Sequence, residues 1–488
     1  MKPNIKTFGQ LKEAGYQYQG IKTELRKNLV QNIQNHQPSF KGIVGYENSV
    51  IPELERAILS GHNINFLGLR GQAKTRLARL MVDLLDEWIP VIEGSEINDD
   101  PFNPISRYAQ QRLEQEGDNC PIEWLSREAR FAEKLATPDV TVADIIGDVD
   151  PIKAANLKLS YADDRVIHYG MIPRANRCIF VINELPDLQA RIQVALFNIL
   201  QEGDIQIRGF KLRLALDMQF VFTANPEDYT NRCSIVTPLK DRIGSQILTH
   251  YPSDIKTARN ITEQEAQLST WQKENIYMPS VARDLLEQIG FQARKSEFVD
   301  VKSGISARMS ITAMQNLMST AERRALLRGD KKTAIRVSDF IGIIPSITGK
   351  VELVYEGEQE GAANVAMTLL GEAIKVQFGE YFPKINKLEK PGAASPYQAI
   401  VDFFYEESSL ELLDEIAEDA YQNALDSIPP LHKLLKEYQP KTDEKDMYFM
   451  KEFVLWALVE YKKLSKERYT QGIMFTDTLG SFMGSFES

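Results

Sequence analysis

The sequence predicts an α/β fold with a parallel sheet, followed by a helical domain and a helical C-terminal extension. Three observations predict it. A phosphate-loop motif stands between a strand-like and a helix-like segment near residue 70. Short apolar runs alternate with helical patterns up to about residue 251, which is typical of a parallel sheet. Beyond residue 255 the apolar spacing is almost wholly helical.

The motif at residues 67–76 reads Leu-Gly-Leu-Arg-Gly-Gln-Ala-Lys-Thr-Arg. The common pattern is Gly, four residues, Gly-Lys-Ser/Thr, in which backbone N–H groups cradle phosphates, Lys reaches the β- and γ-phosphates and the hydroxyl holds Mg²⁺. Ala73 stands where the second glycine belongs, and we expect Gly71 to supply the positive φ that Ala73 cannot adopt cheaply. A plain glycine turn before a helix is the weaker alternative. The residues expected to hold ATP are Gly68, Arg70, Gly71, Gln72, Ala73, Lys74, Thr75 and Arg76.

The segments on either side of the motif have the required pattern. Residues 63–67 are a short apolar run that predicts a buried strand, and residues 75–88 carry leucine and methionine at helical spacing. Four further strands are predicted at 91–93, 178–182, 219–223 and 246–249. Strand, loop and helix therefore occur in the order that a phosphate loop needs.

Polar residues follow two of these strands. The run 178–182 ends in Asn183-Glu184, where an Asp-Glu pair would be expected in an ATP-hydrolysing site. We expect Asn183 to join Thr75 around Mg²⁺ without adding negative charge, and Glu184 to act as the base that aligns water. The predicted strand at 219–223 leads to Asn225, whose amide is expected to orient the attacking water or to contact the γ-phosphate. For Asn225 the alternative is an ordinary Asn-Pro turn.

Two arginines are candidate cations for the γ-phosphate. Arg242 lies at a predicted helix end, and Arg308 begins a helix in the second domain. Either guanidinium would neutralise charge that develops on the γ-phosphate. Surface arginines without a catalytic task are the alternative reading for both.

Composition argues against several classes of protein. The 488 residues include 57 Lys and Arg against 68 Asp and Glu, a net charge of −11, so broad attraction to nucleic acid is not supported. Cys120, Cys178 and Cys233 are odd in number and widely spaced, which suits a reducing compartment. No stretch approaches the roughly 18 apolar residues of a membrane span. We expect a cytoplasmic protein without a membrane segment.

The chain is expected to divide into four segments. Residues 1–37 form a helical lead-in, 38–251 the nucleotide-binding domain, 252–350 a helical domain and 351–488 an acidic helical extension. Residues 94–138 are interpreted as an insertion without an assigned role. Asn98-Asp99-Asp100 within it are interpreted as a polar loop rather than a metal site.

The extension carries an acidic tract. Residues 391–430 contain nine Asp and Glu and no Lys or Arg. Leu410, Leu413 and Ala417 keep an apolar stripe, which predicts a packed helix with a solvated acidic face. A docking surface for a basic partner is the alternative.

As a set, the motifs resemble the AAA+ ATPases of the MoxR and magnesium-chelatase I-subunit branch. Besides the loop and the strands that end at Glu184 and Asn225, the resemblance rests on Ile43-Val44-Gly45 at the entrance to the domain. Three further stretches carry it, at residues 144–150, 170–176 and 200–209. The resemblance covers about residues 40–345.

The resemblance implies a ring, commonly hexameric, with ATP·Mg²⁺ between subunits and an AAA+ core followed by a helical lid at 252–350. It implies that Ile43 and Val44 pack near the adenine. The other implied roles are an arginine finger for Arg242, sensor 2 for Arg308 and sensor 1 for Asn225. It also implies a helix-2 insertion at about 144–176, a hairpin at 205–214 that carries Arg208, Lys211 and Arg213, and a protein partner with a von Willebrand factor A domain.

Two departures from the family pattern, Ala73 and Asn183, predict slow or partner-stimulated ATP hydrolysis. The first hypothesis is therefore a remodelling ATPase that matures a partner complex, with chelatase-like metal insertion as one form of that work. The second is a nucleotide-gated assembly scaffold with little or no hydrolysis. A DNA-associated motor, suggested by the basic hairpin, is disfavoured by the net acidity.

Overall fold

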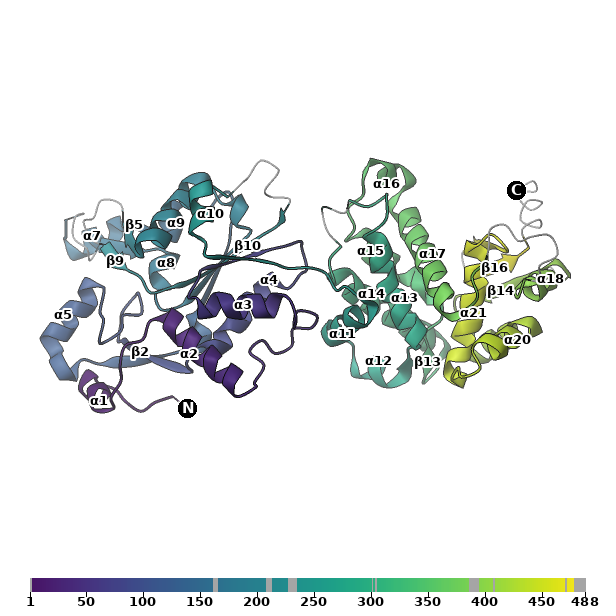
Figure 1. The fold of residues 1–488 in the computed structure, drawn as a ribbon, viewed down its shortest axis with the longest axis horizontal. Coiled ribbons are helices and arrows are strands. Elements are labelled where there is room, and N and C mark those ends of the chain that lie inside the picture. The colour runs from purple at the N-terminus through teal and green to yellow at the C-terminus, as the bar shows by residue number, and fades with distance from the viewer. Residues whose placement is uncertain are drawn as a thin grey trace. The chain divides into compact units, whose positions relative to one another are not determined.

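The computed structural model describes residues 2–160, 166–207, 213–226, 235–300, 302, 305–385, 395–406, 409–469 and 472–477. The chain forms two compact units, Met1–His250 and Tyr251–Ser488 (Figure 1). The first contains the predicted lead-in and nucleotide-binding domain. The second contains the predicted lid and the C-terminal extension.

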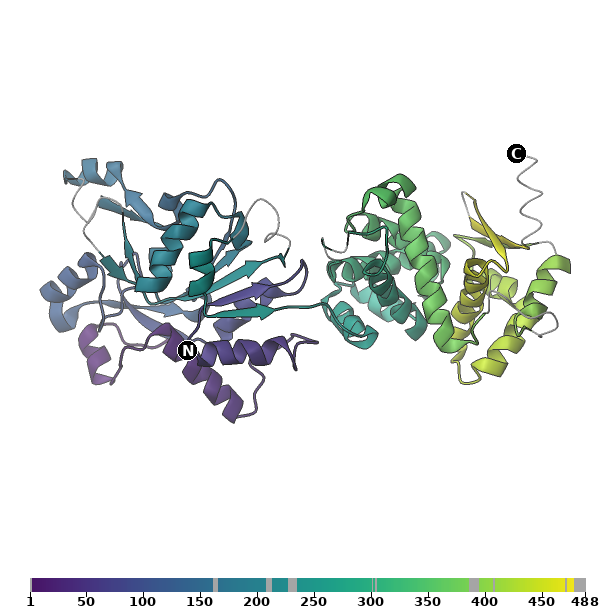
Figure 2. The ribbon, with the colours of Figure 1, turned by 45° about the horizontal axis from the view of Figure 1, so that its top comes forward.

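A five-stranded sheet in the order β11-β1-β10-β7-β4 organises the first unit (Figure 2). Every neighbouring pair of strands in it is parallel. The expected α/β fold with a parallel sheet is therefore confirmed. The strands are β1 (Ile64–Leu67), β4 (Phe131–Leu135), β7 (Ile179–Asn183), β10 (Gln219–Ala224) and β11 (Ser245–Leu248).

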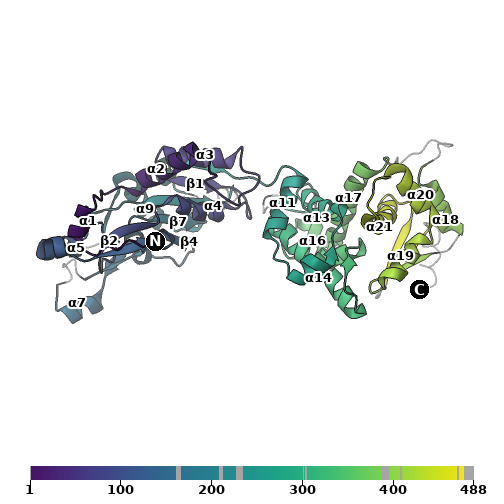
Figure 3. The same cartoon turned by 90° about the horizontal axis from the view of Figure 1, so that it is seen from below.

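Helices cover both faces of this sheet because side chains along each strand alternate between them. Ile179 and Val181 of β7 pack with α2 (Ile21–Gln34), α3 (Val50–Leu59) and α4 (Lys74–Leu80). Phe180 and Ile182 pack on the opposite side with α9 (Ala190–Glu202) and α10 (Thr237–Arg242). Figure 3 shows α2 and α3 over β1. Because the five strands are all parallel, their carboxyl ends lie at one edge of this three-layer arrangement.

The edge strand differs from the prediction. Residues 91–93 do not enter the sheet, because β2 (Trp88–Ile92) pairs antiparallel with β3 (Ile122–Ser126). The fifth parallel strand is β4, which lies in the stretch interpreted as an insertion. Two of the five residues in its sequence, Phe-Ala-Glu-Lys-Leu, are charged, as is usual for a strand at the edge of a sheet. An apolar run was therefore the wrong signal for this strand.

The lead-in is tied to the edge strand by a buried ion pair. Glu24 of α2 accepts two hydrogen bonds of 2.6 Å from the guanidinium of Arg130, immediately before β4. The two side chains are 3% and 1% exposed. Residues 1–37 are thus part of the first unit's core.

The other elements of the first unit are α1 (Phe8–Glu13), α5 (Arg107–Glu116), α6 (Val142–Ile145), α7 (Pro151–Leu157), α8 (Met171–Arg174), and the antiparallel pairs β5 (Gly147–Val149) with β6 (Ile167–Tyr169) and β8 (Asp204–Gln206) with β9 (Arg213–Ala215).

The cysteines and the 98–100 loop follow the plainer interpretations. Cys120 and Cys178 are free and buried, and burial raises the pKa of the Cys178 thiol to about 11. Asp99 accepts hydrogen bonds from the backbone of residues 105 and 106, and Asp100 pairs with Arg177 at 2.9 Å. Both carboxylates therefore have protein partners. Cys233 lies outside the described residues.

The second unit is mainly helical. Among its described residues, no helix combines the length and apolarity that a membrane span needs, and the same holds for the first unit. Its elements up to residue 381 are α11 (Ile255–Glu265), α12 (Thr270–Asn275), α13 (Ser280–Ala293), α14 (Arg308–Arg328), α15 (Ile344–Thr348), α16 (Tyr355–Glu360), α17 (Ala362–Tyr381) and the short parallel pair β12 (Ile276–Tyr277) with β13 (Thr333–Ala334).

The C-terminal extension contains a small sheet that the sequence did not predict. Leu410 and Leu413 lie on β14 (Leu410–Leu413), so their helical interpretation was wrong. This strand pairs with β16 (Gly472–Thr476), which pairs with β15 (Ser465–Tyr469). Leu410 and Leu413 are spaced as on one face of a helix, but in the strand Leu410 and Leu412 are buried and Leu413 is exposed, and pairing with a strand about 60 residues away fixes this arrangement. The helices here are α18 (Gln398–Glu406), α19 (Glu418–Asp426), α20 (Pro429–Tyr438) and α21 (Glu444–Glu460).

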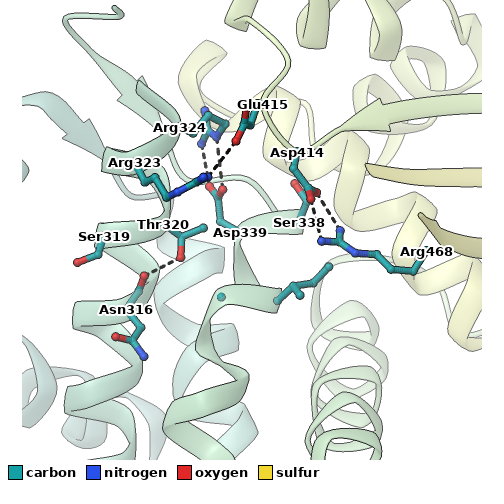
Figure 4. Close-up of a pocket in the computed structure, with 12 residues that line it drawn as sticks. Asn316, Ser319, Thr320, Arg323, Arg324, Ser338, Asp339, Asp414, Glu415 and Arg468 are labelled. Carbon is teal, nitrogen blue, oxygen red and sulfur yellow. Dashed lines mark hydrogen bonds and ion pairs between the residues drawn. The ribbon is translucent and has the colours of Figure 1, made fainter. Parts of the chain in front are cut away.

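The lid and extension share one hydrophobic core, which runs from Ala266 to Phe475. A pocket of about 460 Å³ lies where they meet. Three ion pairs line it, as Figure 4 shows. Arg324 pairs with Asp339 at 2.8 Å, Arg323 with Glu415 at 3.0 Å and Arg468 with Asp414 at 2.8 Å. The Arg323–Glu415 pair joins the predicted lid to the extension, and together with the shared core it makes both segments one folded unit.

Candidate functional site

The phosphate-loop motif joins β1, an interior strand of the sheet, to helix α4. The strand ends at Leu67, and α4 begins at Lys74. The helix runs to Leu80 and continues as a 3₁₀ turn to Leu84, which is shorter than the predicted 75–88 because Trp88 opens β2. The loop thus opens onto the sheet edge where parallel strands end.

The loop backbone is left-handed at two positions. Gly71 has φ +73°, as expected, but Ala73 also has φ +56°. The expectation that Gly71 would spare Ala73 this conformation was therefore wrong. A left-handed alanine costs roughly 1–2 kcal/mol because its Cβ crowds the following carbonyl. The loop keeps the shape that a glycine would give it, with some backbone strain.

We predict that Ala73→Gly raises the free energy of unfolding by up to about 1 kcal/mol. Glycine adopts the left-handed conformation without the steric cost, and the larger entropy of its unfolded chain offsets part of the gain. Urea unfolding of the full chain measures the change. Ala78→Gly, inside α4, is the matched control and should destabilise by roughly 1 kcal/mol. A less stable Ala73→Gly variant would contradict the prediction.

Lys74 points back over the loop. Its Nζ donates hydrogen bonds to the carbonyl oxygens of Gly68 and, at 3.0 Å, Leu69. It also donates to Oδ1 of Asn225 at 2.8 Å. The predicted phosphate-binding lysine and the predicted strand-end amide therefore meet, although they are 151 residues apart in sequence.

Two hydroxyls converge on the amide oxygen of Asn183. Thr75 Oγ1 and Thr223 Oγ1 each donate to Asn183 Oδ1 at 3.1 Å. Thr75 and Asn183 thus place oxygens side by side, and oxygens are the donors that Mg²⁺ prefers. The residues present fit a magnesium ion, although the set of Thr75 and Asn183 carries no negative charge of its own.

Glu184 follows β7 in a left-handed conformation, with φ +56° and ψ +48°. Its backbone N–H donates to Thr223 Oγ1 at 3.1 Å, and a 3₁₀ turn at Leu185–Asp187 follows. A non-glycine residue in this region costs free energy and persists only where the surrounding structure holds it. Glu184 is half-buried beside the amide of Asn183, at the edge where the loop opens.

Glu133 belongs to this cluster, although the sequence analysis gave it no role. Its Oε1 accepts a 2.6 Å hydrogen bond from Asn183 Nδ2. Its Oε2 pairs with Arg79 of α4 at 2.6 Å, and the Arg79 guanidinium lies over the Phe131 ring at 4.7 Å. The sequence signal that could have identified Glu133 is its place between Phe131 and Leu135, since these three residues lie on one face if the segment is a strand.

Close packing fixes the other end of the loop. A Cβ atom on Gly68 would lie 2.0 Å from Thr249 Oγ1 and 2.2 Å from Gln72 Oε1, so only glycine fits. Gln72 is buried and accepts a 2.7 Å hydrogen bond from Thr249. Tyr46 donates to the carbonyl oxygens of Gln72 and His250. No sequence motif pointed to Tyr46 or Thr249.

The remaining residues predicted to contact ATP are Ile43, Val44, Arg70 and Arg76. Ile43 and Val44 are partly buried just before Tyr46, and Ile43 packs on the core under α2 and α3. Arg70 and Arg76 are exposed. Tyr46 thus holds the predicted adenine-contacting segment beside the loop.

Neither predicted arginine is brought into the cluster by the described contacts. Arg242 ends α10, bonds to Asp241 and to Gln201 of α9 at 3.4 Å, and lies over Phe197. Arg308 begins α14 in the second unit and is exposed. Of the hairpin cations, Arg213 is exposed on β9, and Arg208 and Lys211 lie outside the described residues.

The parallel sheet, the loop between β1 and α4 and the polar strand ends define an α/β protein of the P-loop type. No family model matches the chain. The solved structures that the chain matches include one chain from the complex between subunits BchI and BchD of magnesium chelatase. The identity is 16% and the TM-score 0.36, over 66% of this chain and 98% of the matched chain.

Two further proteins match at similar levels. A candidate ATPase from Cytophaga hutchinsonii is 16% identical over 74% of this chain and 97% of its own, with a TM-score of 0.31. NtrX from Brucella abortus is 14% identical over 62% of this chain, with a TM-score of 0.36. The match spans 55% of the length of NtrX. A complex of NtrX with ATP also matches, at 12% identity and a TM-score of 0.36, over 71% of this chain and 72% of that one.

Proposed function

We propose that this protein binds ATP·Mg²⁺ at the loop between β1 and α4 and hydrolyses it slowly. The observation that carries the proposal is the meeting of Lys74 with Asn225 and of Thr75 with Asn183 at one edge of the sheet. A lysine and a hydroxyl at the start of a helix, opposite two strand-end amides, are the parts that a nucleoside triphosphate site needs.

Each side chain has a distinct task in this proposal. Lys74 binds the β- and γ-phosphates, and Asn225, its hydrogen-bond partner, turns to the γ-phosphate. Thr75 and Asn183 would hold Mg²⁺, which neutralises charge on the phosphate oxygens when bound. Glu184 accepts a proton from the attacking water and aligns it. The left-handed backbone of Glu184, held by Thr223, sets the direction of this carboxylate.

Arg242 and Arg308 are proposed to act from outside this cluster. Arg242 ends α10 with contacts to α9, and the resemblance implies that its guanidinium serves a neighbouring subunit's nucleotide as an arginine finger. Arg308 is exposed at the start of α14, and the resemblance implies that it is the sensor 2 arginine for the γ-phosphate. An arginine that contacts a neighbouring subunit's nucleotide requires an assembly of subunits, and the resemblance implies a ring that is commonly hexameric.

The work proposed for the ring is remodelling or maturation of a partner complex, with a partner that bears a von Willebrand factor A domain. This rests on the order of motifs, which resembles MoxR and chelatase proteins. The second candidate is an assembly scaffold gated by ATP. The amide at Asn183, in place of a carboxylate, favours slow hydrolysis and so favours this alternative.

The test compares wild type with Lys74→Ala for ATP binding, Mg²⁺-dependent ATP turnover and assembly state in the same nucleotide conditions. We expect measurable turnover in wild type and at least about tenfold weaker ATP binding in Lys74→Ala, because a charge-assisted contact to phosphate is worth roughly 1.5–3 kcal/mol. Lys27→Ala, exposed on α2, is the matched control.

The three possible results separate the candidates. Turnover that is lost in Lys74→Ala supports the ATPase. Assembly driven by ATP without turnover supports the scaffold. Absence of ATP binding by wild type overturns both.

A further inference from the structure

The metal side of the proposed ATP site lacks a carboxylate where one is expected, and the structure places one next to it. Asn183 offers Oδ1 to the hydroxyls of Thr75 and Thr223, and its Nδ2 donates to Oε1 of Glu133 at 2.6 Å. Glu133 thus lies one amide group away from the oxygen pair that fits Mg²⁺.

Glu133 decides which way the Asn183 amide faces. The two threonine hydroxyls can donate or accept, so they are compatible with either the oxygen or the nitrogen of the amide. An ionised carboxylate only accepts, so the NH₂ group of Asn183 must face Glu133. The amide oxygen is consequently held toward Thr75. Without Glu133 the amide could turn its NH₂ group toward Thr75, and an NH₂ group does not ligate a cation.

The strand register explains how Glu133 reaches this position. In the parallel pair of β4 with β7, Leu135 lies opposite Asn183 and Glu133 opposite Val181. Residues 131, 133 and 135 share the face that packs toward α4, and the longer glutamate side chain extends forward to Asn183. Its side chain is 29% exposed, so its charge acts in a partly desolvated setting.

The charge of Glu133 is only partly compensated. Arg79 binds the other carboxylate oxygen, but this guanidinium is 64% exposed and rests on Phe131. An ion pair with one exposed partner is weakened by solvent. Arg79 thus occupies one carboxylate oxygen of Glu133, and the other oxygen is bonded to the Asn183 amide.

We propose that Glu133 takes over the task of the missing strand-end carboxylate. As a positioning residue it holds the Asn183 oxygen toward Thr75, and it supplies the negative charge that the amide lacks. The inference rests on the proposed function, because it concerns the affinity of the same site for Mg²⁺. It predicts that the departure at Asn183 does not by itself abolish metal-dependent nucleotide binding.

The experiment measures the dissociation constant of a fluorescent ATP analogue for the full chain, with Mg²⁺ and with EDTA. The dissociation constant in EDTA divided by the constant with Mg²⁺ measures how much the metal strengthens binding. In Glu133→Gln we expect this ratio to fall by roughly 10–100-fold, the usual cost of losing a residue that orients a metal ligand. Binding in EDTA should stay the same or tighten, because a negative charge near the phosphates has been removed.

Two variants separate the charge from simple structural damage. Arg79→Ala breaks the same ion pair but keeps the carboxylate, so its ratio should match or exceed that of wild type. The Glu133→Gln/Asn183→Asp double variant moves the charge to position 183 and should restore the ratio lost in Glu133→Gln. Asn183→Asp alone places two carboxylates in contact, and like charges oppose ionisation. We therefore expect it to raise the ratio above that of wild type by less than the double variant raises it above that of Glu133→Gln.

The outcomes are distinguishable. A Glu133→Gln ratio equal to that of wild type, with normal Mg²⁺-dependent binding by wild type, overturns the inference alone. Equal losses in Arg79→Ala and Glu133→Gln, without rescue by the double variant, also overturn it. Wild type that does not bind ATP overturns the proposed function and the inference together.

Discussion

Glu184→Gln is expected to lower ATP turnover by about 10²–10⁴-fold, the usual contribution of a positioned general base, while ATP binding persists. The amide keeps the shape of the glutamate but cannot accept a proton from water. The backbone should not change, because the Glu184 N–H remains bonded to Thr223 and the left-handed conformation is set by the same turn. Loss of rate without loss of binding is the signature of an interaction made only in the transition state.

Single-turnover hydrolysis and equilibrium ATP binding should be measured on the same preparations. Glu123→Gln, on the exposed side of β3, makes the same chemical change away from the loop and should leave both unchanged. Because Asn183 predicts slow wild-type hydrolysis, a single-turnover assay gives the sensitivity that the comparison needs. A Glu184→Gln variant that hydrolyses ATP at the wild-type rate would remove Glu184 from the mechanism.

Glu24→Ala is expected to destabilise the first unit by about 3–5 kcal/mol, since it leaves a buried guanidinium without its counter-charge. Arg130 donates two 2.6 Å bonds to Glu24, and its Nε donates to the carbonyl oxygen of Arg177 at 2.9 Å. Glu24 also accepts from the backbone of Asp86 at 2.7 Å. With both side chains at most 3% exposed, water cannot replace the lost partner.

Urea-dependent hydrogen exchange, read by mass spectrometry on peptides from β7 and β10, reports the stability of the first unit separately from the second. Asp118→Ala, which removes an exposed ion pair with Lys12, is the control and should cost less than about 1 kcal/mol. A Glu24→Leu/Arg130→Met variant should lose less than Glu24→Ala, because no buried charge is left unpaired. If Glu24→Ala changes stability no more than Asp118→Ala does, the pair does not anchor the lead-in.

The two predictions are linked by the chain itself. Arg130 stands immediately before β4, and Glu133 lies three residues further on. A loosened ion pair at Arg130 would therefore release the strand that positions Glu133 beside Asn183. We expect Glu24→Ala to weaken Mg²⁺-dependent ATP binding as well, by a route that Asp118→Ala does not share.

Much of the site could be predicted because its parts are local. The loop residues adjoin one another in the chain, and Asn183, Glu184 and Asn225 each follow a run of apolar residues. Parallel strands have their carboxyl ends at one edge of the sheet. The residues that follow β7 and β10 therefore lie near the phosphate loop, which follows β1. The contacts of Lys74 with Asn225 and of Thr75 with Asn183 follow from that rule.

Other features depend on contacts that no local pattern encodes. The left-handed Ala73 opposes its own backbone preference and is held by the loop around it. Leu410 and Leu413 have a spacing that fits a helix, yet pairing with β16 makes this segment a strand that buries Leu410 and Leu412 instead. Such choices are made by packing, which overrides a weak local signal.

The sequence by itself determined the parallel α/β core, the loop and the polar ends of its strands, because apolar periodicity and neighbouring residues encode them. Only the tertiary structure decided that β4 is the edge strand and that Glu133 faces Asn183 across it. It also decided that the lead-in is anchored through Glu24 and that the lid and extension share one core. The physical reason is the same in each case: these partners lie about 50 or more residues apart, and only the folded chain brings their charges and apolar surfaces together.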